Sequence, residues 1–210
     1  AENLANGNGL VFNIDERVEG FSNPLWTLFF ALVIGVGLDP VFTSVCFGYA
    51  CIVFLGWSTF KLANTLNILP LVAVAAVMLD PGMLLEAVQG LESVFYAALI
   101  TWGLALIIEE RKGDSPPQWG STLVFAAALL TRPEAPLLIF LIHLGLCIQD
   151  GKWDQSIRAG VALLGLLIVM MLFRIGYYGE IFPNTYYAKV GGTAFSRGLS
   201  YLKTYTIYHP

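Results

Sequence analysis

The chain has 210 residues, a formal net charge of −4, 57% hydrophobic residues and 12% charged residues. Its mean hydropathy is +0.70, whereas soluble domains carry charge at about 25% of positions, so the composition places this chain in a lipid bilayer. The acidic balance and the scattered lysines and arginines exclude nucleic acid as an expected partner. Three cysteines lie inside apolar runs without metal-ligand spacing and are interpreted as small core residues: Cys46, Cys51 and Cys147.

Residues 1–23 form a polar segment ahead of the first apolar run. Asp15, Glu16 and Glu19 make it the densest acid cluster of the chain, with Arg17 between them. Glycine, asparagine and serine around this cluster favour turns. Two interpretations are open: a solvated loop that keeps one end of a hydrophobic protein in water, or a loop that carries function.

The sequence predicts an all-α transmembrane helix bundle of about six or seven membrane segments. In chain order, the apolar runs are residues 24–38, 41–60, 68–79, 93–108, 121–130, 135–148 and 159–173. A crossing needs about 20 residues, so 41–60 has the right length, 24–38 is short, and 68–79 is short enough to be re-entrant. Residues 83–92 carry polar groups at helical spacing and predict a short amphipathic turn at the interface.

A charged break separates residues 121–130 from residues 135–148. One continuous helix there would bury Arg132 and Glu134 in lipid, and Pro133 between them disfavours helical backbone. We therefore expect two helices joined by a turn.

The end of the chain is predicted to be polar on both sides of the last membrane helix. Residues 150–158 are expected to be a polar connector, and residues 174–210 a polar, aromatic segment that begins as the helix of residues 159–173 ends. The expected organisation is thus a loop at 1–23, a helix bundle at 24–173 and an aromatic-rich segment at 174–210. Arg174 is expected to cap the last helix.

Loop charge predicts the orientation, because cytoplasmic loops are enriched in lysine and arginine. The loops predicted to be cytoplasmic hold Arg111 and Lys112, and Lys152 and Arg158. The outer face then collects Glu92, residues 131–134 and residues 174–210. Residues 1–23 lie on that same face only if the chain crosses the membrane an even number of times between them and Glu92. Three apolar runs lie in between, 24–38, 41–60 and 68–79, so one of them must not cross. We expect this to be 68–79, because it is the shortest.

Arginine and tyrosine suggest chemistry on the predicted outer face. Arg132 and Arg174 each offer a planar fork of donors suited to a phosphate, and we expect them to approach each other. Tyrosines between 177 and 187, together with Asn184, suit a sugar. The structural alternatives are a local ion pair of Arg132 with Glu134 and an interfacial aromatic belt. His143 is expected to be a polar contact between helices.

Five short motifs together resemble a known family. They are Asn-Leu-Ala-x-Gly-x-Gly-Leu-Val-Phe-Asn (3–13), Glu-Arg-Val-Glu-Gly-Phe-Ser-Asn-Pro-Leu-Trp (16–26), Gly-Leu-Glu (90–92), Thr-Arg-Pro-Glu (131–134), and Phe-Arg with Tyr-Tyr-Gly and Pro-Asn-Thr-Tyr-Tyr-Ala-Lys (173–189). In this order they resemble bacterial polytopic glycosyltransferases of the GT-C class. The most similar group includes the mycobacterial arabinofuranosyltransferases that use a polyprenyl-phosphate donor.

The resemblance implies a multi-pass enzyme of the bacterial cell membrane that moves a sugar to a glycan, lipid or protein acceptor on the outer face. By this resemblance, Glu19 is expected to be a catalytic acid, and Asp15 and Glu16 are weaker candidates. The remaining assignments are Arg132 and Arg174 for the donor phosphate, and Glu92, Glu134, Asn184, Tyr186 and Lys189 for substrate. A divalent metal cofactor is left open. The family's acidic pair opens this loop, so we expect the main catalytic acids upstream of Ala1, in a longer protein.

Other functions and other roles for Glu19 compete with this interpretation. A transporter or flippase would carry charges inside several helices or in two repeats, whereas here charge lies mostly at helix ends and no internal repeat is visible. A non-catalytic membrane subunit is the third possibility. Glu19 itself is either catalytic, a cap for the helix that follows, or a partner of Arg17.

Overall fold

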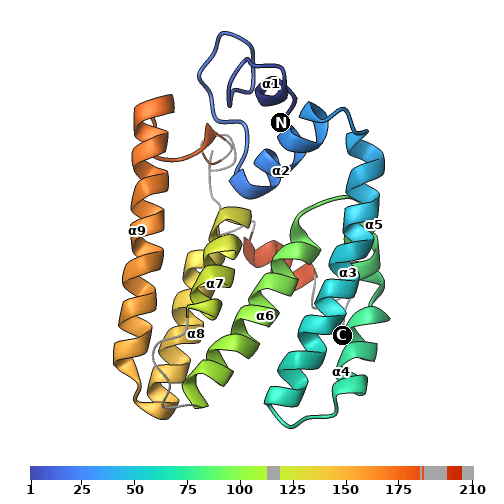
Figure 1. The fold of residues 1–210 in the computed structure, drawn as a ribbon, viewed down its shortest axis with the longest axis vertical. Helices are drawn as coiled ribbons and strands as arrows, with labels where there is room; N and C mark the ends of the chain where they lie inside the picture. Colours follow the sequence, from blue (N-terminus) through green and yellow to red (C-terminus); the bar gives the residue numbers. More distant parts are fainter. Residues whose placement is uncertain (113–118, 185, 187–197, 205–210) are drawn as a thin grey trace.

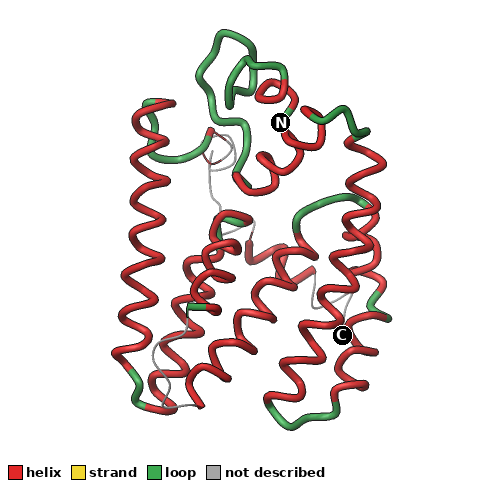
Figure 2. The backbone as a smooth tube through the Cα atoms, in the orientation of Figure 1, coloured by secondary structure: helices red, strands yellow, loops and turns green. Residues whose placement is uncertain are grey.

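The computed structural model describes residues 1–112, 119–184, 186 and 198–204. The helices are α1 (Glu2–Ala5), α2 (Pro24–Gly35), α3 (Pro40–Thr65), α4 (Pro70–Met78), α5 (Pro81–Val88), α6 (Ser93–Lys112), α7 (Gly120–Thr131), α8 (Ala135–Asp150) and α9 (Trp153–Tyr178). Figures 1 and 2 show a helical bundle, and no strand occurs among the described residues. The predicted all-α class is confirmed.

Local chemistry sets the start of several helices. Proline occupies the first position of α2, α3, α4 and α5, where its missing N–H costs nothing and its fixed φ suits a helix. Two aspartates add side-chain caps: Asp39 accepts from the Phe42 N–H at 2.6 Å, and Asp80 accepts from the Met83 N–H at 2.8 Å. These Asp-Pro pairs therefore turn apolar runs into helices with defined starts.

Helices α4 and α5 run back along α3 as one bent pair. The two are bent by 57°. A Cβ atom added at Gly56 would lie 3.0 Å from the Met78 sulfur, and one added at Gly48 would collide with the Ala87 carbonyl oxygen. Thus α4 packs on the later half of α3 and α5 on its earlier half, which brings Gly90 back beside Ser44.

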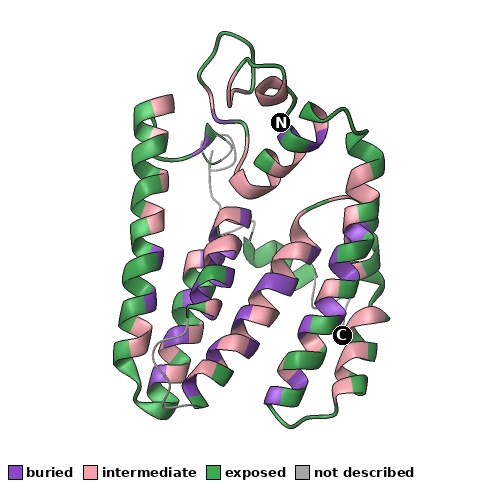
Figure 3. Cartoon of the chain, viewed as in Figure 1, coloured by how far each residue is buried: buried purple, intermediate pink, exposed green. Residues whose placement is uncertain are grey.

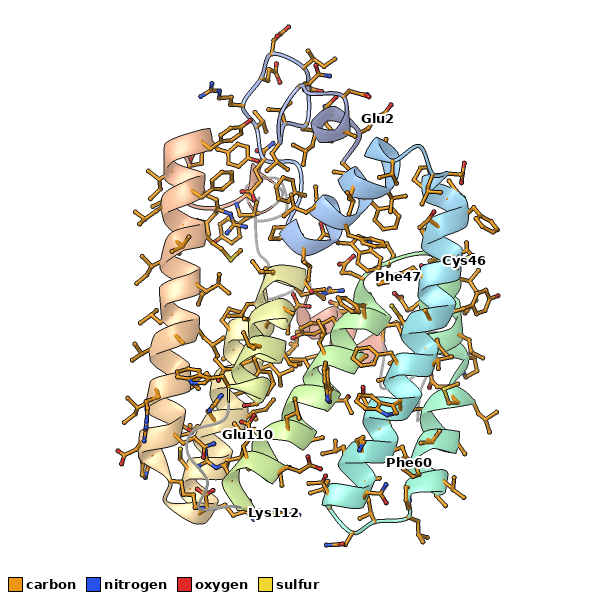
Figure 4. All side chains as sticks on the ribbon, in the orientation of Figure 1. Glu2, Cys46, Phe47, Phe60, Glu110 and Lys112 are labelled. Atoms are coloured by element: carbon orange, nitrogen blue, oxygen red, sulfur yellow. The ribbon has the colours of Figure 1, made fainter. Side chains whose placement is uncertain are left out.

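The bundle has two polar ends. The upper end in Figure 1 holds residues 1–23, and the lower end holds the turns after α3 and α8. At the lower end, Thr65 donates to Glu109 at 2.9 Å and Lys112 donates to the Thr65 carbonyl at 2.7 Å; Figure 4 labels Lys112 there. The two predicted basic loops thus lie together at the lower end. The turns that hold Glu92 and Arg132 lie together at the upper end, as the sequence predicted.

The crossings before Glu92 can be counted in two ways. Residues 70–78 are too short to cross alone, but α4 and α5 together return the chain from the lower end to the upper end (Figure 1). The short helix α2 stays at the upper end. An even count before Glu92 is reached if α3 and the α4–α5 pair cross and α2 does not, or if the pair is re-entrant, as expected for residues 68–79, and both α2 and α3 cross.

Three described helices are long and apolar enough to cross a membrane: α3, α6 and α9. The bent pair makes a fourth if it is one span, and α2, α7 and α8 are shorter apolar helices. The predicted limits of the last helix are wrong, because α9 has 26 residues and includes most of the expected connector. Arg174 consequently lies inside α9, one turn before its end, and does not cap it.

The core lies among α3, α6, α7 and α8. Phe125 of α7 is fully buried and packs with Ile107 and Leu129, and a second cluster joins α3, α5 and α6. A series of aromatic contacts connects α2 to both of these hydrophobic clusters. The rings are those of Trp26, Phe29, Phe47, Phe95, Phe54 and Trp102. Helix α9 is mostly exposed in Figure 3, which suits a helix that faces lipid.

Candidate active site

A buried ion pair joins the N-terminal loop to α9 at the upper end. The Arg174 Nε atom lies 3.0 Å from one Glu19 carboxylate oxygen and 3.1 Å from the other. The Glu19 side chain is 5% exposed and the Arg174 side chain 17%. The two residues are 155 positions apart in sequence, so only the fold brings them together.

Neighbouring contacts hold this loop in place. The Tyr178 hydroxyl donates to the Leu10 carbonyl at 2.6 Å, and the Asn184 N–H donates to the Glu19 carbonyl at 3.2 Å. Arg17 lies over the Tyr177 ring at 5.4 Å, an arrangement that favours a cation–π contact. The loop is thereby held at Leu10, at Arg17 and at Glu19 itself, which limits how far the Glu19 carboxylate can move.

The alternatives considered for Glu19 do not hold in this structure. Its partner is Arg174 and not Arg17, and the N-cap of α2 is Asn23, which makes no side-chain cap. Burial raises the pKa of the Glu19 carboxyl, and the charge of Arg174 and its hydrogen bond partly offset that rise. A carboxylate with a raised pKa binds a proton more readily than an exposed one, which suits a general base.

The Glu19–Arg174 pair lies in an otherwise apolar cavity of about 310 Å³. The cavity is bounded by the N-terminal loop, α2, the end of α7 and the last two turns of α9. Its apolar lining consists of Leu10, Phe21, Pro24, Leu28, Leu130, Met170 and Phe173. A cavity with one cation, one carboxylate and hydrocarbon walls suits a ligand that is itself part anion and part hydrocarbon.

A second polar cluster surrounds Arg132 where α7 ends and α6 begins. The Arg132 guanidinium lies 3.5 Å from Glu92 and 2.5 Å from Glu134, and it donates to Ser93 at 3.1 Å. Its contact with Glu134 has ion-pair distance but not hydrogen-bond alignment. The predicted Arg132–Glu134 contact therefore exists, and Glu92 joins it from the turn that precedes α6.

Tyr96 belongs to this cluster and was missed by the sequence reasoning. The Arg132 guanidinium carbon lies 6.0 Å from the centre of its ring, and its buried hydroxyl has no hydrogen-bond partner among the described residues. Tyr96 follows Glu92 by one helical turn, so helical spacing alone would place both side chains on one face of α6. That spacing was the available signal.

The other predicted site residues do not gather in one place. Among the described residues, Arg132 and Arg174 make no contact with each other: each is bound to its own carboxylates. Tyr186 is exposed and stacks on Phe182 at 4.7 Å, and the Asn184 side chain is also exposed. Lys189 lies outside the described residues.

The weaker acidic candidates lie away from the cavity lining. Glu16 is exposed and accepts from the Asn13 side chain at 2.9 Å, and Asp15 is also exposed. Within the described residues, no three histidine, cysteine, aspartate or glutamate side chains are close enough to hold a metal ion. The described groups at the upper end that can take part in chemistry are carboxylates, guanidinium groups and tyrosines.

Comparison with curated proteins shows two significant relatives. The chain is 30% identical over 223 residues to a protein of Mycobacterium tuberculosis named terminal beta-(1->2)-arabinofuranosyltransferase. It is 27% identical over 234 residues to a protein of the same name in Corynebacterium glutamicum. Each match covers 97% of this chain. The chain is a relative of these arabinofuranosyltransferases.

The relationship predicted from the five motifs is thereby confirmed, and it links this helical bundle to glycosyltransferases of the GT-C class. The chain spans about a third of the relatives' length, with 35% and 34% of them covered. No family model matches the chain. No solved structure matches it significantly.

Proposed function

We propose that this chain is the donor-binding part of a membrane glycosyltransferase that moves a sugar from a polyprenyl-phosphate donor to a glycan, lipid or protein acceptor of the cell envelope. The observation that carries the proposal is the buried Glu19–Arg174 pair in an apolar cavity. A polyprenyl phosphate combines an anion with a long hydrocarbon chain, which is the combination that this cavity offers. The two relatives support a sugar as the transferred group.

The proposed chemistry uses both members of the pair. The acceptor oxygen forms a bond to the anomeric carbon as the bond from that carbon to the phosphate oxygen breaks. The acceptor proton moves to a carboxylate, and the bonding electrons leave with the phosphate. Arg174 stabilises the departing phosphate through its fork of donors, and Glu19 accepts the proton or works beside an upstream acid that does so.

Arg132 is proposed as a second cation for the same phosphate. Glu92 and Glu134 hold its guanidinium at the upper end, two residues beyond Leu130, which lines the donor cavity. The unpartnered Tyr96 hydroxyl offers a hydrogen bond to a sugar or phosphate oxygen beside it. Asn184, Tyr186 and Lys189 are proposed to contact the acceptor.

The test is Glu19→Gln in the full-length protein, assayed for sugar transfer from a polyprenyl-phosphate donor. Glutamine keeps the size and hydrogen-bonding oxygen of glutamate but accepts a proton poorly. We expect turnover to fall by about a hundredfold or more, the scale of a positioned proton acceptor, with unchanged thermal unfolding. Glu16→Gln, three positions earlier and exposed, is the matched control and should keep normal turnover. Near-normal transfer by Glu19→Gln would remove Glu19 from the site.

The proposal also requires a fixed orientation, with the upper end on the outer face of the cell membrane. Single cysteines at positions 152 and 92, in a background without native cysteines, test this with a membrane-impermeant thiol reagent in intact cells. Position 92 should label and position 152 should be protected, because the lower end holds the basic loops. Labelling at 152 with protection at 92 would invert the bundle and contradict donor binding on the outer face.

A further inference from the structure

The proposed donor cavity holds as much negative charge as positive charge. Its lining is hydrocarbon apart from Glu19 and Arg174, which are the charged side chains of the lining as far as the structure describes it. The Arg174 Nε atom lies 3.0 and 3.1 Å from the two Glu19 carboxylate oxygens. The guanidinium charge is therefore already balanced by a carboxylate of the protein.

The second cation proposed for the phosphate is balanced in the same way. Arg132 has ion-pair contacts with Glu92, at 3.5 Å, and with Glu134. Among the described residues, the two arginines of the upper end are thus in contact with three carboxylates. A site for a highly charged anion would be expected to present an excess of cations. The charge balance of this end is therefore a feature that needs a reason.

Burial makes this balance effective. The Glu19 side chain is 5% exposed and the Arg174 side chain 17%, so little water screens the charges in the cavity. The charge that acts on Glu19 is that of Arg174, and Tyr178, one turn further along α9, is a neighbour that is neutral at ordinary pH. Glu19 must then repel an anion bound to Arg174, and it repels two negative charges about twice as strongly as one.

The proposed transfer changes the charge of the lipid phosphate. In a polyprenyl-phosphate sugar the phosphate is a diester and carries one negative charge. Breaking the bond to the anomeric carbon leaves a monoester, which carries close to two negative charges at about pH 8, because the second pKa of such a group is about 6. Substrate and spent lipid have the same hydrocarbon chain, so the phosphate charge is what distinguishes them beside Arg174.

We propose that Glu19 makes the donor cavity selective for phosphate charge, so that it binds a lipid phosphodiester with one negative charge and disfavours a lipid phosphomonoester with two. This inference rests on the proposed function and gives Glu19 a role in specificity in addition to proton transfer. Its consequence is release of the spent lipid. Once any proton taken up by Glu19 has returned to water, an ionised carboxylate faces a phosphate dianion and favours its departure.

Two small probes isolate the charge from the rest of the ligand. Farnesyl phosphate is a monoester with up to two negative charges, and methyl farnesyl phosphate is a diester with one, on the same hydrocarbon chain. Neither carries a sugar, so their binding does not depend on transfer. The experiment measures both dissociation constants by isothermal titration calorimetry of the purified full-length protein, at about pH 8, where the monoester is mostly a dianion.

The parent protein should bind the methyl ester more tightly than farnesyl phosphate. Glu19→Gln removes the charge at nearly constant size, and it should improve the binding of farnesyl phosphate relative to the methyl ester by about tenfold or more, the scale of one like-charge contact in a partly buried site. Glu19→Asp keeps the charge and should keep the preference of the parent protein. Glu16→Gln, which is exposed, is the matched control and should leave the preference unchanged.

A change of pH tests the same inference without a variant. At about pH 5 farnesyl phosphate carries close to one negative charge, so the parent protein should lose its preference for the methyl ester. Protonation of Glu19 acts in the same direction, because it removes the repelling charge. A preference that is equally strong at both pH values overturns the inference.

The variants can contradict the inference in two further ways. A ratio of the two dissociation constants that is the same in the parent protein and in Glu19→Gln overturns it. Weaker binding of both probes by Glu19→Gln also overturns it, because Glu19 would then hold Arg174 in place for the ligand. Either result leaves the proposed donor cavity standing. A parent protein that binds neither probe overturns the proposed function and this inference together.

Discussion

Each end of the bundle pairs one arginine with one carboxylate, and the buried member is Arg111 at the lower end and Glu19 at the upper end. At the lower end, Arg111 donates from Nε and Nη2 to Asp150, and its other hydrogen bonds go to Ser156, the Lys152 carbonyl and the Cys147 sulfur. At the upper end, Arg174 donates to Glu19 from Nε alone among the described residues.

The difference lies in how fully each guanidinium is bonded. A guanidinium with its donors occupied by protein has none left for a ligand, so the Arg111 pair joins α6 to the turn after α8. The Arg174 guanidinium lines a cavity, and its two Nη atoms make no hydrogen bond to any residue that the structure describes. Counting bonded donors therefore separates a structural ion pair from a candidate binding site better than the presence of a buried pair does.

The largest expected effect falls on the lower pair. Asp150→Ala leaves the Arg111 side chain, which is 4% exposed, as a buried charge without its carboxylate. Removing one partner of a buried pair typically costs about 3–5 kcal/mol. Thermal unfolding of the purified protein measures the loss. Asp154→Ala, four positions away and exposed, should change stability by about 0.5 kcal/mol or less; equal melting of both variants would contradict the structural role.

The upper pair should respond in donor binding as well as in stability, because Glu19, whose side chain is 5% exposed, would lose its counter-charge. Arg174→Ala should weaken donor affinity by about tenfold to a hundredfold, since a hydrogen bond to a charged group contributes about 1.5–3 kcal/mol. Arg174→Lys keeps the charge, loses the fork and should be partly active. Binding of a polyprenyl-phosphate donor gives the readout, with Arg158→Ala, exposed near the start of the same helix, as the arginine control. Unchanged affinity in Arg174→Ala would make this pair structural too.

The smallest effect concerns pH. A proton acceptor works only when deprotonated, so transfer should rise with pH as Glu19 loses its proton. Burial raises the pKa of Glu19, so this rise should lie at higher pH than for an exposed glutamate. Arg174→Gln removes the charge that opposes the shift and should move the rise to still higher pH. A pH profile of turnover with the opposite displacement would exclude Glu19 as the group that titrates.

Sequence reasoning predicted what depends on local pattern. The two helices on either side of residues 132–134 follow from a proline between two charges, and α7 and α8 end and begin there. The last helix was predicted too short because its limits were drawn at the edges of hydrophobicity. Helical backbone extends past the hydrocarbon when polar residues at its ends reach the interface, as Asp154 and Arg174 do.

The candidate site depends on contacts that no local pattern contains. The acid cluster pointed to Glu19, but its pairing with Arg174 spans 155 positions. Arg111 was counted only as a loop charge, although it is buried and bonded to Asp150. Both pairings follow from the order in which the helices return to each end, which was the uncertain part of the topology.

The bend between α4 and α5 has a mechanical consequence. A proline break of 57° in a membrane helix pair resembles a hinge. Here both helices of the pair pack closely against α3 at glycine residues, which have no side chain. Met78 of α4 lies beside Gly56, and the Ala87 carbonyl of α5 lies beside Gly48. A hinge with both arms clamped transmits displacement instead of absorbing it. Movement of α3 would therefore be carried directly to the short turn that bears Glu92, and with it to the Arg132 cluster.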